Sequence, residues 1–313
     1  MTRQYHLICP FCHSEDVKNW HEVYDYKVSG ERFHINDCNH CGLRYTQDPP
    51  VEAEAGPYYD SPNYVSHSDN RSGIMFRLYH GVRKYMLNKK RRLIGRYSSG
   101  KKIIDLGSGT GYFLDNMKRH GYEVTGIEIN EGARNFSKDA FSLEVYPPEL
   151  LAKGEITKRF HIATMWHVLE HIYQPETFLR QLNGVLEDDA LLVIAVPNYR
   201  SSDATHYGTY WAGYDVPRHL WHFDQNTITA LLKKCGYNYL STHRLPFDSF
   251  YVSMLSEKYR KNALYLLSGL MHGSFSWIAS ILNINRTSSL IYFFTRTKKY
   301  DTDRRKSFFI QCC

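Results

Sequence analysis

The sequence lacks a long apolar run behind its first residues, and it contains little cysteine. Met1 is followed by Thr2, Arg3 and Gln4, so we expect no secretory signal and a cytoplasmic protein. Seven cysteines occur in 313 residues, and four of them form two C-x-x-C pairs. In a reducing compartment, such pairs indicate a metal site and not a disulfide framework.

Charge of neither sign dominates the composition. The net charge is +7, with the basic residues spread along the chain. This mild excess is compatible with an anionic substrate, RNA or a membrane surface, and it selects none of them. The apolar and charged fractions, 42% and 23%, are typical of a soluble globular chain, and the length suffices for one large domain and a small module.

The cysteine pairs define the small module, which we place at residues 1–47. They are Cys9 and Cys12, then Cys38 and Cys41. Between the pairs, residues 21–28 and 32–36 alternate like two strands of a hairpin. Two such pairs at the ends of a hairpin predict a zinc ribbon, in which four thiolates hold one tetrahedral zinc. No ligand position is left open, so the predicted role of the zinc is structural.

Two segments connect this module to the rest of the chain. Residues 48–70 are rich in proline and acids, and we interpret them as a linker. Residues 71–97 have helical spacing, with one apolar face formed by Ile74, Leu78, Val82 and Met86. The basic run at 89–92 is expected to be a solvated face, and a phosphate-binding patch is the alternative.

The stretch 101–130 has the pattern of a strand, a glycine-rich turn, a helix and a second strand. Ile103 and Ile104 belong to a short buried strand that Asp105 ends. Three glycines follow, where backbone can approach a ligand closely: Gly107, Gly109 and Gly111. The helix is expected to end at a left-handed cap, Gly121, and the second strand ends near Glu128.

The details of this turn favour one ligand. A dinucleotide-binding turn has the pattern G-x-G-x-x-G, with a small residue at the third position. Counted from Gly107 or from Gly109, that position is Tyr112 or Leu114. Asp105 would repel a pyrophosphate and suits an ammonium group, whereas Glu128 can accept two hydrogen bonds from a ribose diol. S-adenosylmethionine carries both groups. The alternatives are a nicotinamide or flavin site, and an ordinary βαβ unit without a ligand.

At these residues the sequence resembles a known family. DLGSGTG at 105–111, the acid Glu128 and HVLEH at 167–171 are similar to class I S-adenosylmethionine-dependent methyltransferases, over about residues 95–245. Bacterial members with a cysteine-rich N-terminal module are the most similar. The resemblance implies an α/β, Rossmann-like domain at 71–300, with a seven-stranded, mostly parallel sheet that binds the cofactor at its carboxyl edge. We assign cofactor contacts to Asp105, Gly107, Ser108, Gly109, Gly111, Tyr112, Glu128, Ile129, Trp166 and His167.

The acceptor side is expected in the segment 199–223, which follows a predicted strand at 191–196. It has no strong periodicity and is rich in aromatic residues and histidine, as a binding loop at a strand end can be. A hydroxyl acceptor would be helped by a general base, and histidine has a suitable pKa. The candidates, in order, are His219, His222 and His167.

An insertion at 248–285 precedes the last predicted strand, 290–296. Residues 263–282 carry no charge, and we expect two short helices, broken at Gly273, that form a buried or pocket-covering hairpin. Contact with a membrane surface through 263–282 is one alternative, and a membrane span is another. Residues 301–313 are expected to be a frayed tail.

Together these patterns predict a methyltransferase that uses S-adenosylmethionine and a structural zinc. The expected acceptor is a small molecule, a sugar or a lipid-linked glycan precursor, methylated on oxygen. An RNA or protein methyltransferase that contacts its substrate through the ribbon is the first alternative. A binding protein without turnover is the second. The sequence selects neither the acceptor nor an oligomeric state.

Overall fold

Seven strands form one central sheet, in the order β10-β11-β8-β7-β4-β5-β6. The computed structural model describes residues 2–59 and 74–297, so part of the predicted linker 48–70 and the predicted tail 301–313 lie outside the described residues. The strands are β4 (Lys102–Leu106), β5 (Glu123–Ile127), β6 (Val145–Tyr146), β7 (Phe160–Trp166), β8 (Leu186–Pro197), β10 (Tyr237–Arg244) and β11 (Ser289–Arg296). All neighbours pair in parallel except β11, which is antiparallel to both β8 and β10. The predicted α/β architecture is therefore confirmed.

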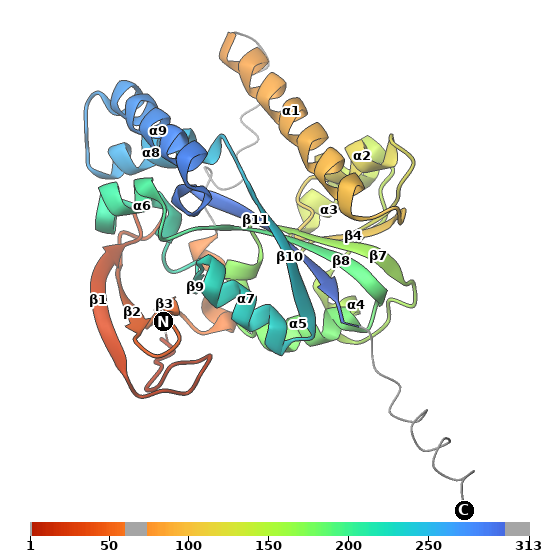
Figure 1. The fold of residues 1–313 in the computed structure, drawn as a ribbon, viewed down its shortest axis with the longest axis horizontal. Helices are drawn as coiled ribbons and strands as arrows, with labels where there is room; N and C mark the ends of the chain where they lie inside the picture. The colour runs from red at the N-terminus through yellow and green to blue at the C-terminus, as the bar shows by residue number, and fades with distance from the viewer. Residues whose placement is uncertain (1, 60–73, 298–313) are drawn as a thin grey trace, which may run out of the picture.

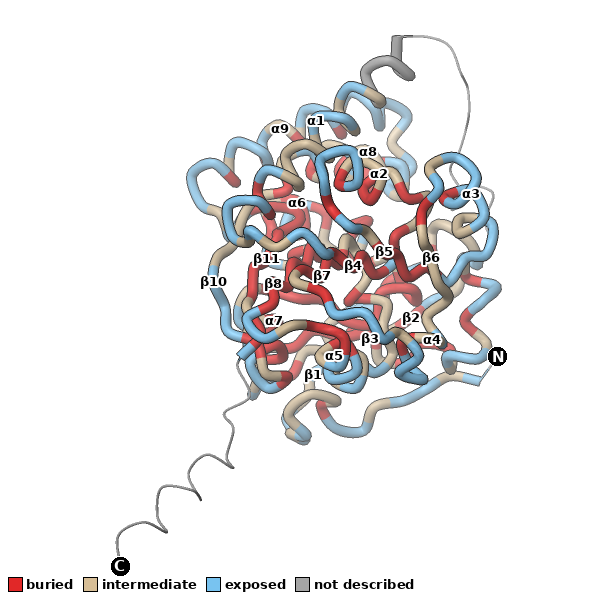
Figure 2. Tube along the Cα trace, turned by 90° about the vertical axis from the view of Figure 1, so that its right-hand side faces the viewer, coloured by how far each residue is buried: buried red, intermediate tan, exposed pale blue. Residues whose placement is uncertain are grey.

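Helices cover both faces of this sheet (Figure 1). One face carries α1 (Ile74–Tyr97), α2 (Tyr112–Lys118) and α3 (Glu131–Phe141), and the other carries α4 (Pro148–Ala152), α5 (Pro175–Asn183) and α7 (Gln225–Lys234). Successive residues of a strand point to opposite faces, so Ile103 belongs to the core on one side and Ile104 to the core on the other. Figure 2 shows the resulting continuous buried interior along the sheet.

The cysteine module supplies three of the four strands of a second, antiparallel sheet. Its order is β1 (Val17–Tyr24), β2 (Arg32–Cys38), β3 (Arg44–Thr46) and β9 (Trp221–His222). The fourth strand comes from the segment 199–223, and Arg44 pairs with His222 across the junction. The first strand ends earlier than predicted because Asp25 starts a turn: its carboxylate accepts hydrogen bonds from the backbone N–H groups of Lys27 and Ser29 (3.1 and 2.9 Å).

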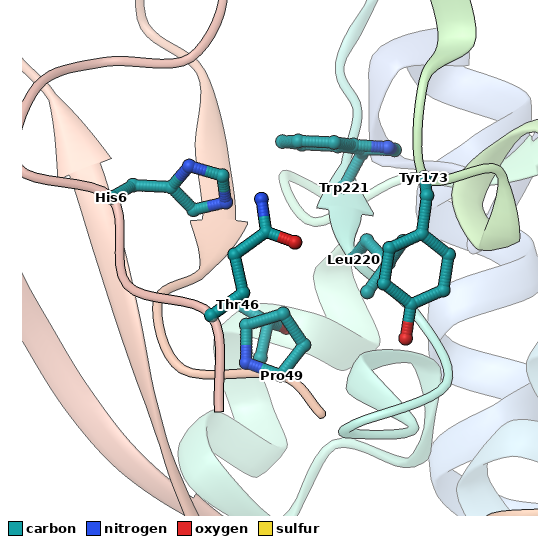
Figure 3. Close-up of a pocket in the computed structure, with 7 residues that line it drawn as sticks. His6, Thr46, Pro49, Tyr173, Leu220 and Trp221 are labelled. Atoms are coloured by element: carbon teal, nitrogen blue, oxygen red, sulfur yellow. The ribbon is translucent and has the colours of Figure 1, made fainter. Parts of the chain in front are cut away.

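The two sheets meet at a closely packed seam. A cavity there has a volume of only about 10 Å³. Residues of the module and of the larger domain line it (Figure 3). That volume is of the order of one water molecule. Hydrogen bonds also cross the seam: Tyr173 Oη donates to the carbonyl of Pro50 at 2.8 Å. The module is thus packed against the larger domain and shares a sheet with it.

The segment predicted as an irregular loop, 199–223, contains short helices. They are α6 (Ser202–Tyr207) and two 3-10 turns, Gly208–Tyr210 and Ala212–Tyr214. Tyr207, Trp211 and Tyr214 are buried there, so these aromatic side chains fill a core and do not line an open pocket. Trp211 Nε1 donates to Asp203 at 2.8 Å, which satisfies its polar atom inside that core.

The insertion forms a helical hairpin of α8 (Asp248–Tyr259) and α9 (Tyr265–Leu282). The predicted break at Gly273 is wrong, because α9 continues through it. A Cβ on Gly273 would lie 2.8 Å from Cα of Phe250, and one on Gly269 would lie 2.5 Å from Cα of Met254. These glycines therefore allow the two helices to approach closely. Within residues 2–59 and 74–297, no helix has the length and hydropathy of a membrane span.

Candidate functional site

The three glycines after β4 have left-handed backbone conformations but different surroundings. Their φ angles are +67° at Gly107, +54° at Gly109 and +80° at Gly111. A Cβ on Gly107 would lie 2.5 Å from Cγ2 of Val168, and one on Gly111 would lie 2.6 Å from Cδ1 of Leu143. A Cβ on Gly109 would meet no atom of the described part of the chain within 4 Å. Gly107 and Gly111 are needed for packing, whereas Gly109 borders open space.

Glu128 lies beside this open position. Its Oε2 accepts a hydrogen bond from the backbone N–H of Gly109 (2.8 Å), and its Oε1 accepts one from that of Asn130 (2.8 Å). Each carboxylate oxygen has a second lone pair, so Glu128 can still accept two further hydrogen bonds. The next residue, Ile129, is 80% exposed and offers an apolar surface next to these acceptors.

Asp105 lies deeper, at the end of β4. It is buried and accepts a hydrogen bond from Thr164 Oγ1 at 2.5 Å. Burial raises the pKa of Asp105 to about 7, opposed by the Thr164 hydrogen bond and by the charge of Lys90, and assisted by the charge of Glu128. Asp105 lies in β4 and Glu128 directly after its parallel neighbour β5, at the edge where open α/β sheets bind ligands, and we take this edge as the candidate cofactor cleft. A cationic ligand there would stabilise the ionised form of Asp105.

Lys90 is a residue of this cleft that the sequence analysis missed. Its Nζ lies 3.8 Å from the ring centroid of Trp166, so it is not on a solvated face as expected. Burial lowers the pKa of Lys90 to about 8, opposed by the charges of Asp105 and Asp248. The sequence contained a signal for this position: Lys90 follows Met86 by four residues and so lies on the same face of the helix as the predicted apolar residues.

Three other predicted contacts surround the turn. Ser108 Oγ is buried and has no hydrogen-bond partner among the described residues. It faces Gly126 on β5, where an added Cβ would lie only 2.7 Å from it. Tyr112 packs under the guanidinium of Arg83, 3.9 Å from the ring centroid. Trp166 Nε1 is buried and has no hydrogen-bond partner.

His167 follows β7 in a left-handed conformation, with φ +59°. Its Nε2 lies 3.3 Å from Oδ2 of Asp248, and its Nδ1 lies 3.3 Å from Oε1 of Glu170. Burial lowers the pKa of His167, but the two carboxylates outweigh burial and raise it to about 9. A ring that is already protonated at neutral pH is a poor general base, so we reassign His167 to a binding role.

His219 and His222, the other two candidate bases, lie in different environments. His222 is 3% exposed, and its Nε2 lies 3.3 Å from Thr46 Oγ1 in the seam, so we propose a structural role for it. His219 lies next to His171, with ring centroids 4.6 Å apart, and next to the buried Glu170. Burial lowers the pKa of His219 to about 4 and also lowers that of His171, so both rings are neutral at pH 7.

A buried ion cluster fixes the chain next to His219. The guanidinium of Arg218 donates to Asp25 at 2.7 Å, to Asp215 at 2.9 Å and to the carbonyl of Tyr58 at 2.9 Å. The side chains of Arg218 and Asp25 are 1% and 0% exposed. The cluster joins the turn after β1 to the segment before β9, and so ties the module to the acceptor side.

We expect Arg218→Ala to lower the free energy of unfolding by about 3–5 kcal/mol, because it leaves buried carboxylates without their partner. Urea unfolding would measure the loss. Arg200→Ala is the matched control: Arg200 pairs with Asp224 at 2.6 Å, but its side chain is 60% exposed. The control should lose less than about 1 kcal/mol. Equal losses in the two variants would contradict a structural role for the cluster.

The four predicted zinc ligands lie together in the module. Sγ of Cys9 is 3.6 Å from Sγ of Cys41, and Sγ of Cys12 is 3.5 Å from Sγ of Cys38. Tetrahedral zinc with bonds of about 2.3 Å requires sulfur atoms roughly 3.7 Å apart. The residues present therefore fit a Cys₄ zinc site.

Comparisons with known proteins agree with this geometry. A family model described as a methyltransferase domain matches residues 78–242, more than half of the chain. The mitochondrial ubiquinone biosynthesis O-methyltransferase of Schizosaccharomyces pombe is 31% identical over 104 residues, which cover 31% of this chain and 38% of that protein. The chain thus matches well under half the length of that relative. The solved structure of magnesium protoporphyrin IX methyltransferase from Synechocystis, with bound SAH, shares the fold, with a TM-score of 0.50 at 11% sequence identity. The match covers 77% of this chain and 97% of that protein chain.

Proposed function

This chain belongs to the methyltransferase domain family, and from that premise we propose that its acceptor is a hydroxyl oxygen of a small molecule. It is an S-adenosylmethionine-dependent methyltransferase of class I. The relatives named as ubiquinone biosynthesis O-methyltransferases support methylation on oxygen. The observation that carries the proposal is the contact of Glu170 with His167, the residue that follows β7 (3.3 Å), because it connects the carboxyl edge of the sheet to the buried cluster of Glu170, His171 and His219.

The residues of the cleft fit the cofactor. S-adenosylmethionine supplies a methyl group on a sulfonium and leaves as a neutral thioether. We assign its ammonium to Asp105, its ribose hydroxyls to Glu128 and its adenine to the exposed side chain of Ile129. Gly109 leaves the space that the ligand needs, and Trp166 Nε1 offers a free donor.

On the acceptor side, the protein has to align an oxygen with the methyl carbon and exclude water. The acceptor oxygen bonds to that carbon as the carbon–sulfur bond breaks, and the electron pair stays on sulfur. The hydroxyl proton has to leave on the acceptor side, where the cluster of Glu170, His171 and His219 contacts His167 at the end of β7.

Transfer of an isotopically labelled methyl group tests this proposal. The protein is incubated with labelled S-adenosylmethionine and separate fractions of small metabolites, lipids, RNA and protein. We expect label in the small-metabolite or lipid fraction, in a product that alkali does not cleave, because an ether resists hydrolysis. Label in RNA or protein would instead support the alternative in which the ribbon contacts a macromolecule.

Cofactor binding should depend on pH through Asp105. Its pKa of about 7 in the free protein means that the carboxylate loses its charge as the pH falls, and the ligand's ammonium then loses its partner. Between pH 7.5 and pH 6, the ionised fraction falls about eightfold, so the Kd for S-adenosylmethionine should rise about eightfold. Calorimetry at several pH values measures this. Asp105→Asn should bind weakly at all of them, and a flat wild-type profile would refute the assignment.

The surface of α9 supports an acceptor with an apolar part. Its buried side consists of small residues, Gly269, Gly273, Ser276 and Ser280. The outward side carries exposed apolar residues: Leu266, Leu267, Leu270, Met271, Phe275, Trp277, Ile278, Ile281 and Leu282. A helix with its apolar side facing outward indicates a further partner. Exposed Lys258 lies in the last turn of α8, and exposed Lys261 lies in the connection to α9. We therefore propose an anionic lipid surface, where a lipid-linked acceptor would be found.

We expect binding to vesicles that contain anionic lipid, and weaker binding to neutral vesicles. Leu267→Glu with Phe275→Glu should reduce vesicle binding at least about tenfold, because both charges would enter the lipid boundary. Leu240→Glu is the control, since Leu240 is also exposed (44%) but lies on β10. Sedimentation with vesicles measures the bound fraction. Equal loss in the control, or none in the double variant, would exclude α9 as the contact.

For the cysteine module we propose one structural zinc, held by Cys9, Cys12, Cys38 and Cys41. The sulfur spacing supports it, and so does the small size of the module, since a core of this size rarely suffices alone. Because four protein ligands complete a tetrahedral site, no position remains for a substrate.

A further inference from the structure

A buried group of hydrogen-bond acceptors combines the turn after β7 with the segment before β9. Glu170, His171 and His219 each offer one ligand atom, and these atoms all lie within 4.8 Å of one another. Glu170 is 0% exposed, and among residues 2–59 and 74–297 its Oε2 has no hydrogen-bond partner. An unpaired buried carboxylate oxygen is costly, so this position calls for a cation.

The two rings present acceptor atoms and not donors. Nδ1 of His171 lies 3.0 Å from the carbonyl oxygen of Arg218, and Nδ1 of His219 lies 2.9 Å from that of Gly213. A carbonyl oxygen can only accept, so each ring carries its hydrogen on Nδ1, and Nε2 keeps its lone pair. Metal-binding histidines are commonly oriented in this way, by donating their other N–H group to a backbone carbonyl.

We propose that Glu170, His171 and His219 bind a divalent transition-metal ion. Two imidazole nitrogens and one carboxylate oxygen are ligands that Zn²⁺, Mn²⁺ and Fe²⁺ accept. Three protein ligands leave coordination positions open, in contrast to the four thiolates of the ribbon. The site combines adjacent residues of the 3-10 turn Leu169–His171 with a residue from the segment before β9.

The position of the site suggests what an open coordination position is for. Oε1 of Glu170 lies 3.3 Å from His167, the first residue after β7, and His167 in turn contacts Asp248 at the start of α8. In a part of the inference that rests on the proposed function, the ion holds the acceptor oxygen and lowers the pKa of its hydroxyl. The hydroxyl proton then leaves to water, and His219 acts as a ligand and not as the base.

Metal binding can be measured without donor or acceptor. The purified full-length protein is dialysed against Mn²⁺, and bound Mn²⁺ is determined by electron paramagnetic resonance, with zinc measured in the same samples. Thiolates bind Mn²⁺ poorly, so the ribbon should not contribute. We expect one Mn²⁺ per chain, displaced by added Zn²⁺, and at least about 100-fold weaker binding in Glu170→Gln and in the double variant His171→Ala with His219→Ala.

Glu170→Gln keeps the shape of the side chain. A melting temperature close to that of the wild type, with the same amount of zinc bound to the cysteine module, would show that the variant folds. A second histidine–carboxylate group, His206, Glu257 and His272, provides the control. His206→Ala should bind Mn²⁺ like the wild type; loss of binding there, with Glu170→Gln unaffected, would overturn the proposal. So would no binding of Mn²⁺ or of a second Zn²⁺ at about 1 mM metal. Mn²⁺ binding without methyl transfer to any hydroxyl would retain the site and reject the proposed function.

Discussion

Leucine in place of Gly109 is expected to weaken S-adenosylmethionine binding at least about 100-fold, or by about 2.8 kcal/mol. Gly109 is the glycine of the turn at which a Cβ would meet nothing within 4 Å, and its N–H is held by Glu128. A side chain there would project into the space next to Glu128, the acid that we propose binds the ribose. Calorimetry of ligand binding and a melting curve would separate lost affinity from lost stability.

The backbone strain of that substitution needs its own control. A non-glycine residue at positive φ costs roughly 1–2 kcal/mol wherever it occurs. Gly154 has a φ of +70°, and a Cβ there would also meet nothing within 4 Å, but it lies in the turn after α4 and away from the cleft. Gly154→Leu should lose similar stability and keep its affinity. If the two variants bound the cofactor equally well, Gly109 would not border the ligand.

The cofactor side of the molecule was predictable because its signals are local. Short apolar runs mark buried parallel strands, and Ile103 and Ile104 lie in such a strand, β4, as expected. Gly121 has the left-handed backbone predicted from its position, with φ +80°. Asn130 caps α3 through a local contact, in which its side chain accepts from the N–H of Ala133 at 2.8 Å. Each of these features depends on a few neighbouring residues.

The acceptor side was predicted less well because its structure depends on distant residues. The two-residue strand β9 has no periodicity of its own and exists through its pairing with β3. The charge of His167 depends on Asp248, which belongs to the insertion. Gly273 was predicted to break the helix, but a glycine is needed there because a Cβ would clash with Phe250 on the neighbouring helix. Spacing along one segment carries no information about such contacts.

Loss of the zinc that we propose for the cysteine module is expected to unfold the module and remove acceptor turnover, while cofactor affinity changes little. In zinc-finger peptides, the metal contributes roughly 10–16 kcal/mol to folding. Cys38→Ser removes a ligand that is 1% exposed, so we expect loss of zinc and rapid hydrogen exchange throughout β1 to β3. Exchange should also increase at β9, because β3 is its partner, and His219 precedes that strand. The amides of β4 and β5 should stay protected, since those strands pair with each other.

Cys235→Ser separates this effect from the loss of any buried thiol. Cys235 is 2% exposed and lies at the end of α7, outside the zinc cluster. It should keep one zinc in the ribbon and normal exchange in β1 to β3, even if its melting temperature falls. If Cys38→Ser retained the ribbon's zinc, the Cys₄ assignment would be wrong. If it lost the zinc but kept full turnover, the sheet shared by β3 and β9 would not support the acceptor side.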